Sequence, residues 1–283
     1  MAIESIINPS KAIERPWEMF FVGFLYSTVA IFLGVWIFKA YSSLIMVFLT
    51  VFAAMPFMYK TMKREEEVDV TLKEEGKILK EHAKVVKYLI YLFIGFVVSY
   101  SIWFVFLPAG IVQSLFGTQI ETIGAINAKI VGDVVSPGSV FLQIFLNNFK
   151  VMLFAIFFAF FYGAGAIFIL TWNASVISAA IGIFVKERIA AYAAAAGSVG
   201  MFNYFHVFSL GLFRYFIHGI PEIAAYFVAG LAGGIISVAV INKDLETNKF
   251  KNIMLDAVNL TLIAIGILVL AALLEVYITP LFF

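Results

Sequence analysis

The stretch His218-Gly219-Ile220-Pro221-Glu222 separates two apolar runs, 189–217 and 223–241, in the second half of the chain. Each run is long enough to cross a bilayer. Pro221 lacks a backbone N–H and has a fixed φ, so it suits the first turn of a helix. The pattern therefore predicts that one span ends before His218 and that the next begins at Pro221. Glu222 would lie in that first turn, where unpaired N–H groups and the helix dipole favour a carboxylate.

Composition indicates a membrane protein. The 283 residues are 63% hydrophobic and 13% charged, with a mean hydropathy of +1.01, well outside the range of soluble domains. We predict an all-α, polytopic transmembrane helical bundle that forms a single membrane domain over residues 1–283. The net charge of +1 argues against nucleic-acid binding, and the absence of cysteine excludes disulfides and thiolate catalysis. We expect no cleaved signal peptide, because residues 1–17 include several charged side chains.

Apolar runs predict about seven spans: 18–38, 44–59, 88–111, 149–171, 189–217, 223–241 and 257–279. The first two form a transmembrane hairpin, 18–59. Segment 112–147 has a short, interrupted apolar face, which favours an outer interfacial segment. The run 174–185 is too short to cross and predicts a re-entrant or interfacial helix.

Segment 60–87 is charged, with both signs interleaved, and predicts a solvated cytoplasmic helix. Leu72, Leu79 and Val86 recur every seven residues and give this helix one apolar stripe. The stripe packs against another segment of the chain or against a second copy. Two repeats do not distinguish these alternatives.

Small residues provide further helix-packing surfaces, because they let backbones approach closely. They are Gly163 and Gly165, Gly230, Gly233 and Gly234, and the run from Ala190 to Gly197. Together with the apolar stripe they lead us to expect a homodimer, the commonest symmetric assembly.

Orientation follows from the lysines and arginines, which collect on the cytoplasmic side. With the N terminus inside, 15 of the 19 fall on that side, including eight in segment 60–87 together with Lys186 and Arg188. We expect a multi-pass protein of the plasma membrane, embedded in the lipid bilayer, with a cytoplasmic N terminus and an outside C terminus.

Polar residues within the apolar segments are candidates for either helix packing or ligand binding. Asn147, Asn148 and Asn173 are typical of interhelical hydrogen bonding. The stretch from His218 to Glu222 is either a helix cap at the membrane surface or a functional polar site, since intramembrane ionisable groups are costly. Three histidines without cysteine make a poor metal set. We find no nucleophile-base or metalloprotease motif, so we predict no catalytic residues, no metal and no cofactor.

The order Asn147-Asn148, then Asn173, then His218-Gly219-Ile220-Pro221-Glu222 resembles the stage II sporulation protein M family over roughly residues 145–240. In the family an Asn-Gly pair is usual where this chain has Asn173 followed by Ala174. The resemblance implies that 148–283 is a family-like core of spans. It also implies a non-catalytic membrane anchor that recruits peptidoglycan-degrading partners.

Two functional hypotheses follow. The first is an integral membrane scaffold that binds unidentified protein partners through the cytoplasmic helix and the outer segment. The alternative is a transporter or channel whose polar site is formed by Asn, His and Glu residues between spans. In both, we predict that Glu222 bonds first-turn N–H groups or His218 and ties its helix to Asn147 or Asn148.

Overall fold

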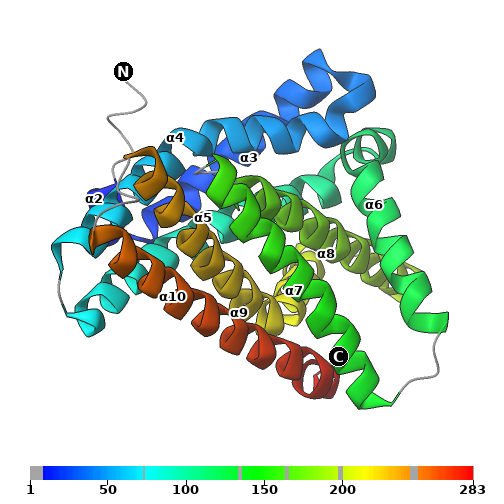
Figure 1. Cartoon of the computed structure of the whole chain (residues 1–283). Coiled ribbons are helices and arrows are strands. Elements are labelled where there is room, and N and C mark those ends of the chain that lie inside the picture. Colours follow the sequence, from blue (N-terminus) through cyan, green and yellow to red (C-terminus); the bar gives the residue numbers. More distant parts are fainter. Residues whose placement is uncertain are drawn as a thin grey trace.

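The computed structural model describes residues 9–72, 74–132, 136–162, 166–196, 200–242 and 248–282. All regular elements in these ranges are helical, which confirms the predicted all-α fold (Figure 1). In chain order they are α2 (Pro9–Glu14), α3 (Glu18–Ile37), η1 (Lys39–Tyr41), α4 (Ser42–Thr71), α5 (Glu75–Phe106), α6 (Ala109–Gly132), α7 (Pro137–Tyr162), α8 (Ala166–Ala196), α9 (Met201–Ile241), α10 (Asn248–Leu273), the π-helix η3 (Leu274–Ile278) and η4 (Thr279–Leu281).

Within the described residues, seven helices are long and apolar enough to cross a membrane. They are α3, α4, α5, α7, α8, α9 and the helix made by α10 with η3 and η4. The predicted number of spans agrees with this count, although several predicted boundaries were wrong. The helices form one bundle, in which α2 and the end of α10 lie at opposite ends (Figure 1).

The largest correction concerns Pro221. It lies inside α9, a continuous helix of 41 residues, so the predicted spans 189–217 and 223–241 are not separate. Such a helix is about 60 Å long, twice the hydrocarbon thickness of a bilayer. Proline is tolerated inside transmembrane helices because neighbouring groups satisfy the carbonyl that it leaves free. Glu222 is therefore a mid-helix residue and has no first-turn N–H groups to bond.

The region before α9 also differs from the prediction. Segment 174–185 does not re-enter, because it is the middle of α8, a continuous helix of 31 residues. The predicted span 149–171 is divided between α7, which begins at Pro137, and α8. Gly163 and Gly165 lie between these helices, outside the described residues. The division between α7 and α8 was not predicted, because the apolar run that contains it has no proline. The charged residues after Val185 predicted a helix end that the structure does not have.

The charged segment 60–87 is divided between the end of α4 and the start of α5 and is not one helix. We call this segment the charged turn-back. α4 continues from the membrane to Thr71, Leu72 is extended (φ −88°, ψ 139°), and α5 begins at Glu75. Leu72 is thus not on the same helix as Leu79 and Val86, and the predicted continuous stripe does not exist. The third span, predicted as 88–111, is the later part of α5 and ends at Phe106.

α6 occupies most of the predicted interfacial segment 112–147, whose remainder is the start of α7. It crosses one end of the bundle (Figure 1) and is fixed there by the buried amide of Gln119. Ser43 Oγ donates to Gln119 Oε1 at 2.8 Å, and Gln119 Nε2 donates to Ser175 Oγ at 3.1 Å. One side chain therefore joins α4, α6 and α8.

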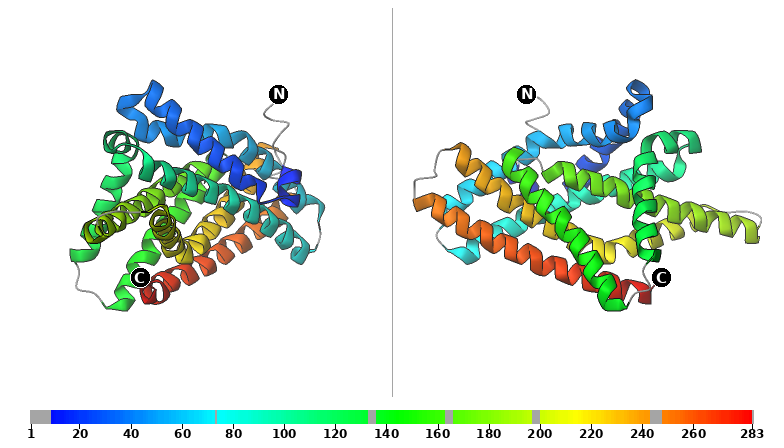
Figure 2. Two further views of the ribbon diagram at one scale, coloured as in Figure 1. Left: turned by 180° about the vertical axis from the view of Figure 1, so that it is seen from behind. Right: turned by 45° about the vertical axis from the view of Figure 1, so that its right-hand side comes forward.

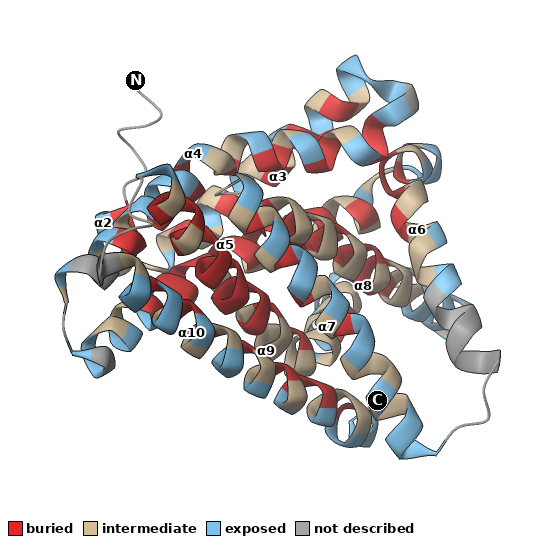
Figure 3. Ribbon diagram, in the orientation of Figure 1, coloured by how far each residue is buried: buried red, intermediate tan, exposed pale blue. Residues whose placement is uncertain are grey.

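The second half of α9 is the centre of the bundle (Figure 3). Gly233 packs directly on the backbone of Ile156 in α7, where an added Cβ would clash with a carbonyl oxygen. Gly230 faces Ala166 of α8, and Gly234 faces Met62 of α4. These three predicted packing glycines are used inside the protein, which leaves none of them for a contact between copies.

Candidate functional site

Three polar side chains meet where α7 crosses the middle of α9. Tyr226 donates its hydroxyl to Glu222 Oε1 at 2.7 Å, one turn along α9. The side-chain amide of Asn148, from α7, also bonds the Glu222 carboxylate. Tyr226 is fully buried and Asn148 is 8% exposed. The carboxylate is thus held by two neutral donors from two helices, inside spanning segments of the bundle.

A second carboxylate, Glu275, lies close enough to interact electrostatically with Glu222. Glu275 is on η3, the π-helix that follows α10. Single π-helical turns inside longer helices occur frequently at functional sites, because the extra residue redirects side chains. Two acidic residues from α9 and η3 therefore share one polar region, which we call the acidic site: Asn148, Glu222, Tyr226 and Glu275.

His218 borders the acidic site. Its Nδ1 is 3.2 Å from Thr279 Oγ1, and that hydroxyl donates to the carbonyl of Leu274 at 3.1 Å. The imidazole therefore connects α9 with the end of the last span. The bonds that Glu222 makes run instead to Tyr226 and Asn148. The sequence indicated the approach of Glu222 to Asn148, whereas Tyr226 and Glu275 were missed.

The other candidate asparagines are outside the acidic site. Asn147 is exposed and makes a long contact of 3.4 Å to Asn148. Asn173 donates to the carbonyl of Ile169 in its own helix at 2.9 Å. The structure thus brings Asn148 and Glu222 together and leaves Asn173 with a local role.

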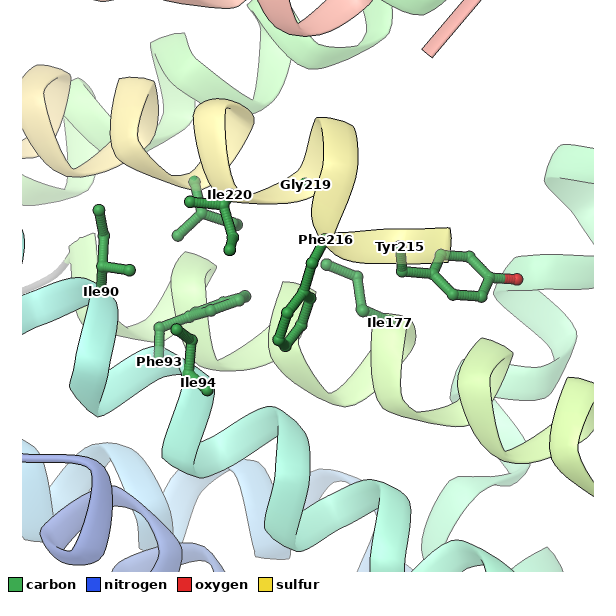
Figure 4. Close-up of a pocket in the computed structure, with 9 residues that line it drawn as sticks. Ile90, Phe93, Ile94, Ile177, Tyr215, Phe216, Gly219 and Ile220 are labelled. Carbon is green, nitrogen blue, oxygen red and sulfur yellow. The ribbon is translucent and has the colours of Figure 1, made fainter. Parts of the chain in front are cut away.

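A small cavity adjoins the same part of α9. Figure 4 shows it between α5, α8 and α9, lined by Ile90, Phe93, Ile94, Ile177, Tyr215, Phe216, Gly219, Ile220 and Ile223. Its volume of about 10 Å³ is no larger than one water molecule, and its lining is almost wholly apolar, so we describe it as dry. Gly219, from the predicted motif, is buried against this cavity.

A second buried network joins α4, α5 and α10 at the other end of α10. His82 Nδ1 is 2.8 Å from Glu65 Oε2, and His82 Nε2 is 2.9 Å from Asp256 Oδ2. Only a doubly protonated ring donates to both carboxylates. Arg64 bonds Glu65 and also Glu81, the latter at 2.8 Å. We call these five residues the ion-pair network.

Sequence reasoning treated this region as a solvated face. His82 is only 2% exposed and Glu65 is fully buried. Their pairing depends on the turn at Leu72. The interleaved charges did not indicate this turn, because they are equally typical of one continuous helix. In the described part of the chain, no group of three or more His, Cys, Asp or Glu residues is arranged to hold a metal ion.

The seven apolar helices, closed around α9 with an acidic site within them, define a multi-pass helical membrane protein. A family model described as Stage II sporulation protein M matches residues 10–280, and the chain therefore belongs to this family. The match extends well beyond the predicted 145–240, so the first hairpin and the charged turn-back are part of the family's common region. No curated protein and no solved structure matches the chain.

Proposed function

We propose that the chain is a non-catalytic integral membrane scaffold that binds a protein partner through the tip of the α8–α9 hairpin. The tip consists of residues 189–195 of α8, Gly200, and residues 201–206 of α9. The observation that supports this proposal is the exposure of its large apolar side chains. Met201 is 88% exposed, Phe202 77%, Phe205 71% and Tyr192 41%.

Many apolar residues of this protein are exposed because lipid covers them, so the position of the tip is what matters. Tyr204 stacks on Phe106, the last residue of α5, with ring centroids 6.1 Å apart. The end of α8 extends beyond the rest of the bundle in the right-hand view of Figure 2. The tip therefore lies past the end of a neighbouring span.

Three cations lie just before the tip, where we place the level of the lipid headgroups. Lys186 lies over the ring of Phe104, and Arg188 and Arg214 both lie over the ring of Phe184, at 5.1, 5.4 and 5.5 Å. Basic residues are favoured beside anionic headgroups. From Arg214 to Met201 the helix rises about 20 Å, whereas one headgroup layer is about 5–8 Å thick. Aromatic residues beyond that layer are typical of a protein-binding surface.

The charged turn-back is a weaker candidate for partner binding than the sequence suggested. Its buried charges are paired internally, as in the ion-pair network. Lys186 and Arg188 lie beside Phe104 and Phe184, at the same end as the last residue of α5. If the N terminus is cytoplasmic, as the other basic residues predict, both belong to the outer side, and so does the tip.

A site-specific crosslinking experiment tests this proposal. The chain has no cysteine, so each single-cysteine variant has no background. The full chain carrying Phe202→Cys is expressed in its native cells and coupled to a photoactivatable maleimide. We expect one discrete protein adduct at Phe202→Cys and the same adduct at Tyr192→Cys.

The matched control is Phe157→Cys, an exposed aromatic position, 51% exposed, in the spanning part of α7. It should give lipid adducts without the protein. If Phe157→Cys yields the same protein adduct, or Phe202→Cys yields lipid alone, the tip does not bind a partner.

The expected homodimer also concerns the tip. The apolar stripe is interrupted at Leu72, and Gly230, Gly233 and Gly234 pack inside the protein. The exposed alanines of α8 are therefore the surface on which we place the contact between copies. Light scattering in detergent should give about twice the 31.5 kDa of one chain. Ala191→Glu should return the mass to 31.5 kDa, and an unchanged dimer would place the contact elsewhere.

A proton- or cation-coupled transporter is the second candidate function, favoured by one observation. Glu222 and Glu275 lie near each other inside spanning segments, one of them on a π-helical turn. Intramembrane carboxylates are typical of ion pathways. In reconstituted vesicles, an ion flux that Glu222→Gln abolishes and that Glu187→Gln, at an exposed position, preserves would support this function. Equal flux in both variants would exclude Glu222 from it.

A further inference from the structure

An open groove runs between α5, α9 and α10 on the outside of the bundle. Its volume is about 500 Å³. Its lining comes from all three helices and includes His82, Lys87, Ile90, Tyr91 and Ile94 on α5 and Ile263 on α10. All three helices are spanning segments, so the apolar part of the groove faces hydrocarbon. A hollow of this size in the hydrocarbon region is filled by lipid chains or by another helix, because an empty one loses dispersion contacts.

The two ends of the groove differ in polarity. From Lys87 to Ile94 the floor on α5 is apolar apart from Tyr91, over about 10 Å, which is about two thirds of the hydrocarbon thickness of one leaflet. Lys87 and His82 lie at the other end, the end that carries the ion-pair network. The groove therefore offers an apolar part for a lipid acyl chain and a cationic end for its headgroup.

Charge at the cationic end of the groove is unbalanced in favour of an anion. Lys87 is exposed and makes no ion pair or hydrogen bond with the other described residues. Lys80 and Lys84 lie seven and three residues before it, on the same helical face. The neighbouring carboxylates already have cationic partners: Glu65 with His82 and Arg64, Asp256 with His82, and Glu81 with Arg64 and Lys84. The described lining itself contains no carboxylate.

We propose that this groove is a binding site for an anionic phospholipid, with one acyl chain along Ile90, Ile94 and Ile263 and the phosphate beside Lys87. The apolar part of the groove accounts for the chain, and the unpaired Lys87 accounts for the selection of negative charge. A zwitterionic lipid fits the apolar part of the groove equally well, but its headgroup has no net charge, so Lys87 adds less to its affinity. A lysine near a lipid phosphate favours an anionic headgroup over a neutral one by about fivefold.

Native mass spectrometry of the full chain tests the site. Delipidated protein in detergent is mixed with phosphatidylglycerol or phosphatidylcholine of identical chains, and the retained lipid is counted. We expect phosphatidylglycerol to be retained about fivefold more. Lys87→Gln should remove that preference and Lys87→Arg should keep it. Lys63→Gln, which removes an exposed lysine on α4, should leave it unchanged.

A second variant tests the apolar part of the groove rather than the charge. Ile263 is 37% exposed at the open side of the groove, so Ile263→Trp fills space without entering the core. It should reduce retention of both lipids while the melting temperature stays near that of the parent. Equal retention of the two lipids, or an unchanged preference in Lys87→Gln, would overturn the proposal. A dimer that Ile263→Trp dissociates would also overturn it, because a second copy would then occupy the groove.

Discussion

The two buried polar regions of this protein are built on opposite principles. In the ion-pair network the carboxylates of Glu65 and Glu81 contact Arg64, and those of Glu65 and Asp256 contact the ring of His82. In the acidic site Glu222 is held by the neutral groups of Tyr226 and Asn148 and lies near a second acid, Glu275. A network of this kind joins helices, here α4, α5 and α10. Intramembrane carboxylates without a cationic partner are costly, and they are typical of ion pathways.

The largest expected effect comes from breaking the ion-pair network. His82→Ala removes the side chain that joins the buried Glu65 to Asp256, leaves Glu65 with Arg64 alone, and should cost about 3–5 kcal/mol. Thermal unfolding in detergent measures this loss. His206→Ala is the matched control, because His206 is exposed at the hairpin tip and stacks only on Phe202, and it should unfold near the parent temperature. Equal losses in the two variants would mean that the network is not structural.

The acidic site should respond less and in a graded way. Glu222→Leu removes the acceptor of the buried Tyr226 hydroxyl and should cost about 1–3 kcal/mol. Glu222→Gln keeps an acceptor oxygen, so its loss should be roughly 1 kcal/mol or less. Denaturation of both variants in one detergent gives the comparison. A larger loss in Glu222→Gln than in Glu222→Leu would show that the negative charge itself stabilises the bundle.

The smallest expected changes in stability come from Asn148 and Asn173, and they should differ between the two residues. Asn148→Ala removes an interhelical bond to Glu222 and should cost about 1 kcal/mol. Asn173→Ala removes only a bond to the preceding turn of α8 and should change stability by less than about 0.5 kcal/mol. The same unfolding measurement applies. If Asn173→Ala is the more destabilising change, Asn173 has an interhelical role that its contact with Ile169 does not explain.

The number of spans and the helical class follow from hydropathy, whereas the boundaries depend on contacts that hydropathy does not record. Pro221 predicts a helix start because proline disrupts helices in water, whereas inside the bundle α9 continues through it. Segment 174–185 is likewise continuous with the rest of α8, although the charged residues after Val185 predict a helix end there. Once these helices are continuous, Glu222 moves from a helix cap to the middle of a span.

The candidate site was predicted only where residue type alone was informative. Asn148 and Glu222 are rare polar groups in apolar runs, so the sequence indicated them. Glu275 is also a lone carboxylate in an apolar run, but only the approach of η3 to α9 brings it near Glu222. Tyr226 bonds Glu222 one turn along α9, a pairing that the predicted helix start at Pro221 did not indicate. His82 lies in a segment with many charged residues, so its type alone did not distinguish it. It reaches Glu65 because the chain turns at Leu72.

We expect the α8–α9 tip to extend beyond the membrane and to present its aromatic residues there. Labelling of single-cysteine variants with a membrane-impermeant maleimide, in intact native membranes, tests it most directly. We predict rapid labelling of Phe202→Cys and Phe205→Cys and no labelling of Phe157→Cys, although all three positions are more than half exposed in the isolated chain. Protection of Phe202→Cys equal to that of Phe157→Cys would place the tip in lipid and contradict the claim.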